Sequence, residues 1–201
     1  MSKLYENSES IFKNIIDLLS KAVKNRRHPY HTPVFSNTTT KNLVESRVIV
    51  LRKFDEINFL LNFHTDFRSP KILSLKKNNS SSFLFYDQNI KTQLRIKSLA
   101  KIHNQNEISK TAWQLTKLSS RKCYLAKKPP SSKTIIPTDS IPEHLMGIDP
   151  NIEESEKGYK NFCVISNKIE TIDWLHLSSK GHRRLLISIN NNKNTYNWLI
   201  P

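Results

Sequence analysis

A succession of short β-rich runs constrains the fold of this 201-residue chain more than any other feature. The runs are rich in β-branched and aromatic residues, and Asp55-Glu56 makes a short hairpin connection between the first two. Their up-and-down order favours a mainly β fold, an antiparallel barrel with helical insertions, in a single domain over 1–201. The expected strands cover 46–54, 57–64, 81–87, 92–104, 161–177, 182–190 and 194–200, preceded by at most one short strand at 33–36.

Helical periodicity is confined to a few segments. Residues 7–24 place apolar side chains on one face, with Asn7 or Ser8 as the N-cap, so an amphipathic helix should occupy most of 1–25. Ser69-Pro70 predicts a second helix start. Residues 106–120 predict a third helix, which 121–128 could continue after a break, and 129–158 are expected to form a long, exposed, Pro-rich and acidic loop.

The glycine and cysteine content excludes several classes of site. The chain has three glycines, and none lies in a strand-to-helix turn, so a P-loop or a Rossmann fingerprint is excluded. If a phosphate binds, side chains must supply most of the contacts. The two cysteines lie outside any CxxC pattern, and the histidines show no HExxH spacing, so no metal site is expected.

The charge balance keeps a second class of function open. The formal charge of +15 arises from 32 basic and 17 acidic residues, which fits a basic nucleic-acid-binding barrel as an alternative. The basic residues are diffuse and form no recognised module, so nucleic acid is the less favoured partner. No apolar run could cross a membrane and the N-terminus lacks a signal-peptide core, so a cytoplasmic protein is expected.

The segment HTDFRSPK carries the clearest indication of a binding site. Arg68 and Lys71 flank the helix start at Ser69-Pro70, where the positive end of the helix dipole disfavours cations. A bound phosphate would satisfy the two side chains, the free N–H groups and the dipole together. We therefore expect an anion at this helix start.

An ordered set of motifs resembles the pyridoxamine 5′-phosphate oxidase family of FMN-binding split barrels. The set consists of RVIVLR, FHTDFRSPK, QLRIKSLA, a Trp followed ten residues later by an Arg, and a terminal NWLIP, and it spans about 45–201. The TDxRSxK form suggests a divergent branch. The resemblance implies a homodimer with FMN at the subunit interface and a small phosphorylated substrate.

In this family, which serves pyridoxal phosphate biosynthesis, hydride passes from the substrate to flavin N5 and O2 is the expected acceptor. The alternative is an FMN-binding protein or reductase without vitamin B6 activity.

The resemblance also assigns site residues, although it identifies no catalytic side chain. Pro70 stands where better-known oxidases have a phosphate-binding Arg, and Trp113 stands where they have a substrate-binding Tyr. The implied substrate-binding residues are Lys117, Arg121, Lys180 and His182. The implied cofactor-binding residues are Arg47, Arg52, His64, Thr65, Arg68, Ser69, Lys71, Gln93, Ser131, Trp174 and Arg184. Of these, Trp174 and Arg184 are expected to reach the flavin near the dimer partner, and Ser131 to contribute from the other subunit.

Overall fold

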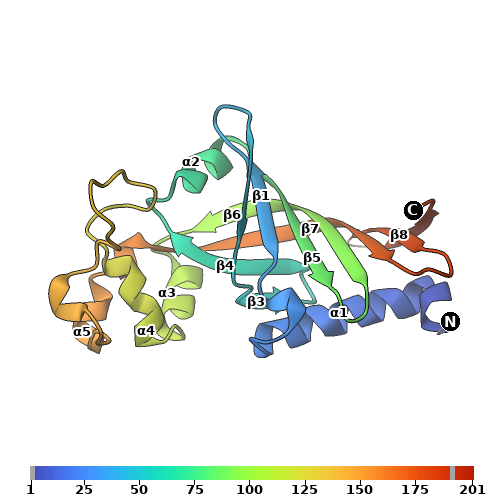
Figure 1. The fold of residues 1–201 in the computed structure, drawn as a ribbon, viewed down its shortest axis with the longest axis horizontal. Helices are drawn as coiled ribbons and strands as arrows, with labels where there is room; N and C mark the ends of the chain where they lie inside the picture. The colour runs from blue at the N-terminus through green and yellow to red at the C-terminus, as the bar shows by residue number, and fades with distance from the viewer. Residues whose placement is uncertain (1–2, 191–192) are drawn as a thin grey trace.

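A computed structural model describes residues 3–190 and 193–201. A short 3-10 turn, η1 (Lys3–Glu6), precedes the long helix α1 (Ser8–Lys24). Asn7 caps α1 by accepting a hydrogen bond from the Ser10 amide, as one of the two expected caps should. Ile11, Ile15 and Leu19 form the buried face of α1, which packs along one side of the sheet (Figure 1).

The strands form one antiparallel sheet in the order β2-β1-β5-β6-β7-β4-β3, with β8 added to β7 and β9 to β8. The sheet curls around a core that includes Phe35, Phe63 and Phe83 but is not hydrogen-bonded into a closed ring. The expected mainly β split barrel with helical insertions is thus confirmed. The strands are β1 (Val34–Thr38), β2 (Val44–Val48), β3 (Lys53–Asp55), β4 (Leu60–Asp66), β5 (Ser80–Asp87), β6 (Thr92–His103), β7 (Phe162–His176), β8 (Arg183–Ser188) and β9 (Thr195–Leu199).

Strand β7 connects the two ends of the molecule. It pairs with β6 along one edge, while its other edge pairs first with β4 and then with β8. Thr65 therefore lies opposite Cys163, at the start of β7, and Arg184 lies opposite Leu175, near its end. Helices α3 to α5 gather at one end of the molecule and β8 and β9 at the other (Figure 1).

The expected strand 46–54 is wrong in one respect, because it is interrupted at 49–52. The Ile49 amide still bonds to Pro33 beside β1, whereas the Arg52 amide bonds to Asn62 on β4. Leu51 between them is fully buried. Burial of Leu51 turns the chain from one sheet edge to the other, which a continuous strand could not do.

The C-terminal half contains more helix than the sequence predicted. The expected helix at 106–120 divides into α3 (Glu107–Gln114) and α4 (Leu118–Arg121), followed by η3 (Lys122–Leu125). The expected exposed loop 129–158 contains η4 (Glu143–Leu145) and α5 (Ile152–Glu156), and buries Leu145 and Ser155. The remaining elements are α2 (Pro70–Lys77), η2 (Pro29–His31) and η5 (Tyr159–Asn161).

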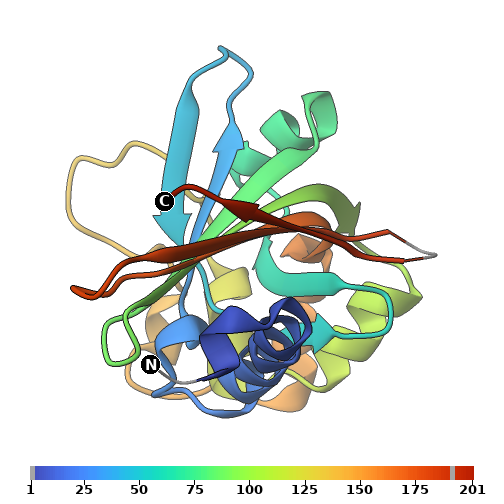
Figure 2. The same cartoon turned by 90° about the vertical axis from the view of Figure 1, so that its right-hand side faces the viewer.

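The β1–β2 hairpin and α2 project from the side of the sheet opposite α1 (Figures 1 and 2). Among residues 3–190 and 193–201, no helix is both long and apolar enough to span a membrane.

Candidate functional site

Two cations meet where β2, β4 and the start of α2 converge. Lys71 Nζ donates hydrogen bonds to Thr65 Oγ1 at 3.0 Å and to Ser69 Oγ at 2.7 Å. Burial lowers the pKa of Lys71, and the positive charge of Arg47 lowers it further. Burial likewise lowers the pKa of Arg47, although Glu45, at 2.9 Å, opposes that shift. The hydrogen-bond acceptors of this ammonium are neutral hydroxyls, and the nearby Asp66 and Glu45 carboxylates raise its pKa less than burial and Arg47 lower it, so an anion here would be stabilised.

Arg68, the other cation of the helix start, is engaged elsewhere. Its Nε and Nη2 donate to the Asp66 carboxylate, the shortest contact being 2.7 Å, and its Nη1 donates to the Ala126 carbonyl at 3.0 Å. The Asp66 hydrogen bonds raise the pKa of Arg68. Arg68 thus ties the segment after Ala126 to the end of β4, and the structure does not bring it together with Arg47 and Lys71 in a cavity lining.

Three adjoining cavities surround His64. The first, of about 520 Å³, is lined by Arg47, Arg52, Thr65 and Lys71 as well as His64, and this is the phosphate-side cavity. The second, of about 460 Å³, includes Ser131 of the segment after η3. The third, of about 600 Å³, is bounded by α3 and the start of α4. Each volume falls in the range of ligand sites.

His64 is held as a neutral ring at the centre of these cavities. Burial lowers its pKa to about 4, and the nearby Arg52 contributes to the shift. The His64 ring meets Phe162 edge-on, with centroids 4.8 Å apart. At neutral pH the side chain can therefore donate or accept a hydrogen bond without carrying charge.

The strand break at 49–52 explains how Arg47 and Arg52 share the phosphate-side cavity. In a regular strand their separation of five would place them on opposite faces. Because the chain turns at Leu51, both residues line the same cavity. The structure thus brings together two of the residues that the motifs assign to the cofactor.

The other expected flavin contacts form a second cluster at the far end of β7. Trp174 is buried against Tyr5 and His176, Gln93 lies on β6, and Arg184 pairs with Asp173 at 2.8 Å. Lys180 and His182 lie exposed in the adjoining β7–β8 turn. Trp174 is eleven residues beyond Cys163 on β7, which corresponds to roughly 30–35 Å. One chain therefore cannot bring both clusters to one ligand of flavin size.

The expected substrate residues of α3 and α4 have different environments. Lys117 is exposed and lines the 600 Å³ cavity. Arg121 is buried, and its guanidinium donates to the carbonyls of Trp113 and Thr116 and pairs with Glu156. Trp113 is buried in the second core cluster. The structure therefore does not bring Trp113 or Arg121 to a cavity.

Several cavity-lining residues lay outside the sequence-based prediction. Arg26, Asn62, Ile108 and Leu115 line the 600 Å³ cavity, and Cys123 lines both of the others. Arg26 lies in a polar segment after α1, and Asn62 lies in the middle of a strand. Neither position belongs to a recognisable motif, so no local signal marked them.

Within the described residues no cluster of three or more His, Cys, Asp or Glu side chains could hold a metal ion.

Comparisons with known proteins identify the class to which this fold corresponds. Residues 13–104 match the family model described as "Pyridoxamine 5'-phosphate oxidase, FMN-binding domain", which confirms the resemblance drawn from the motifs. Residues 13–104 are thus similar to this FMN-binding domain, and they lie in an open antiparallel sheet. A search of curated protein sequences finds no match.

Solved structures extend the similarity of fold over nearly the whole chain. A pyridoxamine 5′-phosphate oxidase-related, FMN-binding protein from Nostoc punctiforme superposes with a TM-score of 0.74 at 16% identity, covering 94% of this chain and 97% of that one. PhzG from Burkholderia lata, solved with tetrahydrophenazine-1-carboxylic acid, gives 0.71 at 16% identity, covering 94% and 92%. At such low identity these similarities show a shared fold.

Proposed function

We propose that this protein is an FMN-dependent oxidoreductase that binds FMN between the two subunits of a homodimer. The observation that carries the proposal is that two partly buried cations, Lys71 of α2 and Arg47 of β2, line the same cavity. The matched family model describes an FMN-binding domain, and FMN supplies a phosphate of the required charge.

The residues present fit this cofactor. Arg47, Lys71 and Ser69 would hold the phosphate, and the neutral His64 and Thr65 would lie against the rest of the molecule without adding charge. When bound, FMN supplies a ring whose N5 accepts or donates hydride. The protein contributes orientation and electrostatics.

The separation of the two clusters on β7 supports a dimeric site. If Gln93, Trp174 and Arg184 contact the same flavin as Lys71, they must come from a second chain, because roughly 30–35 Å separates them within one chain. Ser131 lines the 460 Å³ cavity beside His64 of its own chain, so it would contribute from the same subunit as Lys71. Lys180 and His182, in the turn beside Arg184, would then reach the substrate from the same subunit.

The chemistry we propose is hydride transfer from a small substrate to flavin N5, with O2 as the acceptor. A phosphorylated vitamin B6 compound is one candidate substrate. A second candidate is an oxidoreductase without vitamin B6 activity. The burial of Trp113 and Arg121 favours it, because of the substrate residues expected around α3 and α4 only Lys117 then lines one of the three cavities described above. Assays of pyridoxal 5′-phosphate formation from pyridoxamine and pyridoxine 5′-phosphates distinguish the two.

A complementation experiment tests the proposed site directly. Lys71→Met and Arg184→Met should each weaken FMN binding about tenfold or more in homodimers. A heterodimer of the two variants contains one site with both defects and one with neither, so it should bind one FMN per two chains with wild-type affinity. Asp173 keeps Arg95 as a partner in the Arg184 variant. A heterodimer that binds no FMN tightly would contradict a site shared between subunits.

A further inference from the structure

We propose that the projecting end of the β1–β2 hairpin, together with the adjacent face of α2, docks the protein on the surface of an anionic lipid bilayer. The hairpin and α2 project on the same side of the sheet, away from α1 (Figures 1 and 2). We call this surface the hairpin–α2 tip, and it consists of Lys41, Leu43, Val44, Leu73, Lys76 and Lys77. The contact would be peripheral, so no segment of the chain has to cross the membrane.

Hydrogen bonds in the turn of the hairpin hold its apolar residues outward. The Thr39 amide donates to the Leu43 carbonyl at 2.7 Å, and Thr39 Oγ1 accepts from the Leu43 amide at 3.1 Å. Asn42 has a positive φ of 61°, a conformation that Asn tolerates better than most residues. Lys77 Nζ donates to the Thr40 carbonyl at 2.9 Å, which joins the end of α2 to the turn. The turn and α2 therefore form one ordered surface.

Three large apolar side chains of the hairpin–α2 tip face solvent. The exposed fractions are 63% for Leu43, 74% for Val44 and 65% for Leu73. Leu73 lies about one helical turn before Lys76 and Lys77, so these three residues share one face of α2. Exposed apolar side chains on a projection, with lysines beside them, suit insertion at the boundary between lipid headgroups and acyl chains.

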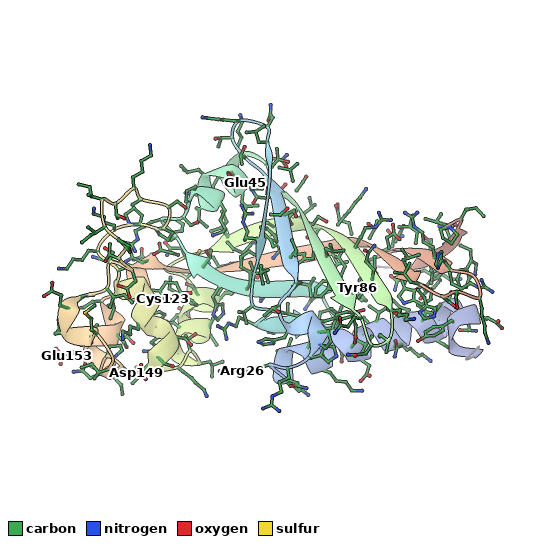
Figure 3. The ribbon with its side chains drawn as sticks, in the orientation of Figure 1. Arg26, Glu45, Tyr86, Cys123, Asp149 and Glu153 are labelled. Carbon is green, nitrogen blue, oxygen red and sulfur yellow. The ribbon has the colours of Figure 1, made fainter. Side chains whose placement is uncertain are left out.

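The charge of the hairpin–α2 tip selects an anionic membrane. Among the described residues, none of the lysines Lys41, Lys76 and Lys77 forms an ion pair. Glu45, beside the turn on the hairpin (Figure 3), is the only acidic residue in 34–48 and 70–79, and it pairs with Arg47 at 2.9 Å. The formal charge of +15 adds a longer-range attraction to a negatively charged surface.

Lipid suits the hairpin–α2 tip better than nucleic acid or a second copy of the chain. Single-stranded nucleic acid is held by cations together with aromatic rings on which bases stack, and the six tip residues include no aromatic ring. A second copy carries the same charge of +15, so repulsion opposes its contact with a basic surface. None of the six residues lines the three cavities around His64, so the inference does not depend on the proposed FMN site.

Co-sedimentation of the 201-residue protein with lipid vesicles tests the inference. Vesicles of phosphatidylcholine alone are compared with vesicles of an equimolar mixture of phosphatidylcholine and phosphatidylglycerol, at physiological ionic strength. The mixed vesicles should bind the protein about tenfold or more tightly, because each lysine at the surface is attracted to the anionic lipid. Equal binding to the two kinds of vesicle, or binding to neither, would overturn the inference.

Matched variants locate the contact. Leu43→Asn should weaken binding to the mixed vesicles about tenfold, whereas Ile57→Asn, at an 85% exposed position in the β3–β4 turn, should leave it unchanged. Lys41→Gln should weaken binding about fivefold, and Lys110→Gln, at an exposed position on α3, should leave it within about twofold of wild type. Equal effects of the tip variants and their controls would indicate general electrostatic adsorption and refute the site.

Two further measurements test the other occupants. Binding of a single-stranded oligonucleotide that Lys41→Gln weakens, without binding of vesicles, would assign the hairpin–α2 tip to nucleic acid. A lower oligomeric state of Leu43→Asn than of wild type in sedimentation velocity would assign it to a subunit interface. Either result would overturn the inference.

Discussion

Arg121 and Lys117 provide a pair of substitutions with opposite expected effects. Motif spacing places both in a substrate clamp, yet the side chain of Arg121 is 8% exposed and donates hydrogen bonds at 3.0 Å to Thr116, 2.9 Å to Trp113 and 3.1 Å to Ser155. Its guanidinium also lies 4.7 Å from the centre of the Trp113 ring. Arg121→Met should therefore destabilise the fold, whereas Lys117→Met should not.

The magnitude follows from the groups that Arg121 leaves behind. Loss of the guanidinium donor to the Thr116 carbonyl should lower the unfolding free energy by about 1–3 kcal/mol. Loss of the cation–π contact with Trp113 should lower it by about 0.5–2 kcal/mol. Trp113 keeps a backbone partner for its carbonyl, and Glu156 is 50% exposed, so water can solvate it. We expect a loss of roughly 2–4 kcal/mol, equivalent to a fall in melting temperature of roughly 5–15 °C.

Urea unfolding monitored by tryptophan fluorescence measures these changes. The Lys117→Met variant should unfold within about 0.5 kcal/mol of wild type, as expected for an exposed side chain without an ion pair. FMN affinity in the folded Arg121→Met protein should stay unchanged. An unfolding free energy for Arg121→Met equal to that of wild type would refute the structural role of this guanidinium.

Two further predictions concern His64 and Arg68. Burial lowers the pKa of His64 from 6.5 to about 4, so the unfolded chain binds more protons between these pH values and stability should fall as pH drops from 6.5 to 4. Between pH 6.5 and pH 4 the unfolding free energy of His64→Gln should fall by about 2–3 kcal/mol less than that of wild type, measured by unfolding at a series of pH values. Equal falls in the two proteins would contradict the burial of a neutral ring. Arg68→Gln removes the hydrogen bond to Ala126, so trypsin should cleave faster after Lys127; an unchanged cleavage rate would show that the tether does not restrain this segment.

The sequence predicted the parts of the fold that local pattern controls. Helix α1 has a strong apolar period and a capping Asn7, and α2 begins at Ser69-Pro70 as expected. The interruption at 49–52 was not predictable from Val and Ile content, because it depends on Leu51 entering a core built by distant strands. The short helix α5 was missed because five residues give little periodicity, and its burial depends on contact with α4.

The candidate site divides in the same way. Thr65, Ser69 and Lys71 lie within one short segment, so their proximity followed from a strand joined to a helix start. Arg26 could not be predicted, because its position depends on how α1 packs against the sheet and delivers the next residues beside α3. Arg121 was predicted to bind substrate from its spacing in the motif alone. Spacing does not show that its guanidinium instead donates a hydrogen bond to the Trp113 carbonyl near the end of α3.

Titration of the purified protein with FMN, followed by visible absorbance after gel filtration, tests the central claim most directly. Wild type should retain about one FMN per chain. Lys71→Met should bind FMN roughly 10- to 150-fold more weakly, the loss expected for a charged hydrogen bond of about 1.5–3 kcal/mol. Lys41→Met, which removes the same charge from an exposed hairpin residue outside the cavities, should bind like wild type. Failure of wild type to retain FMN, or equal affinity in the Lys71 and Lys41 variants, would contradict the proposed site.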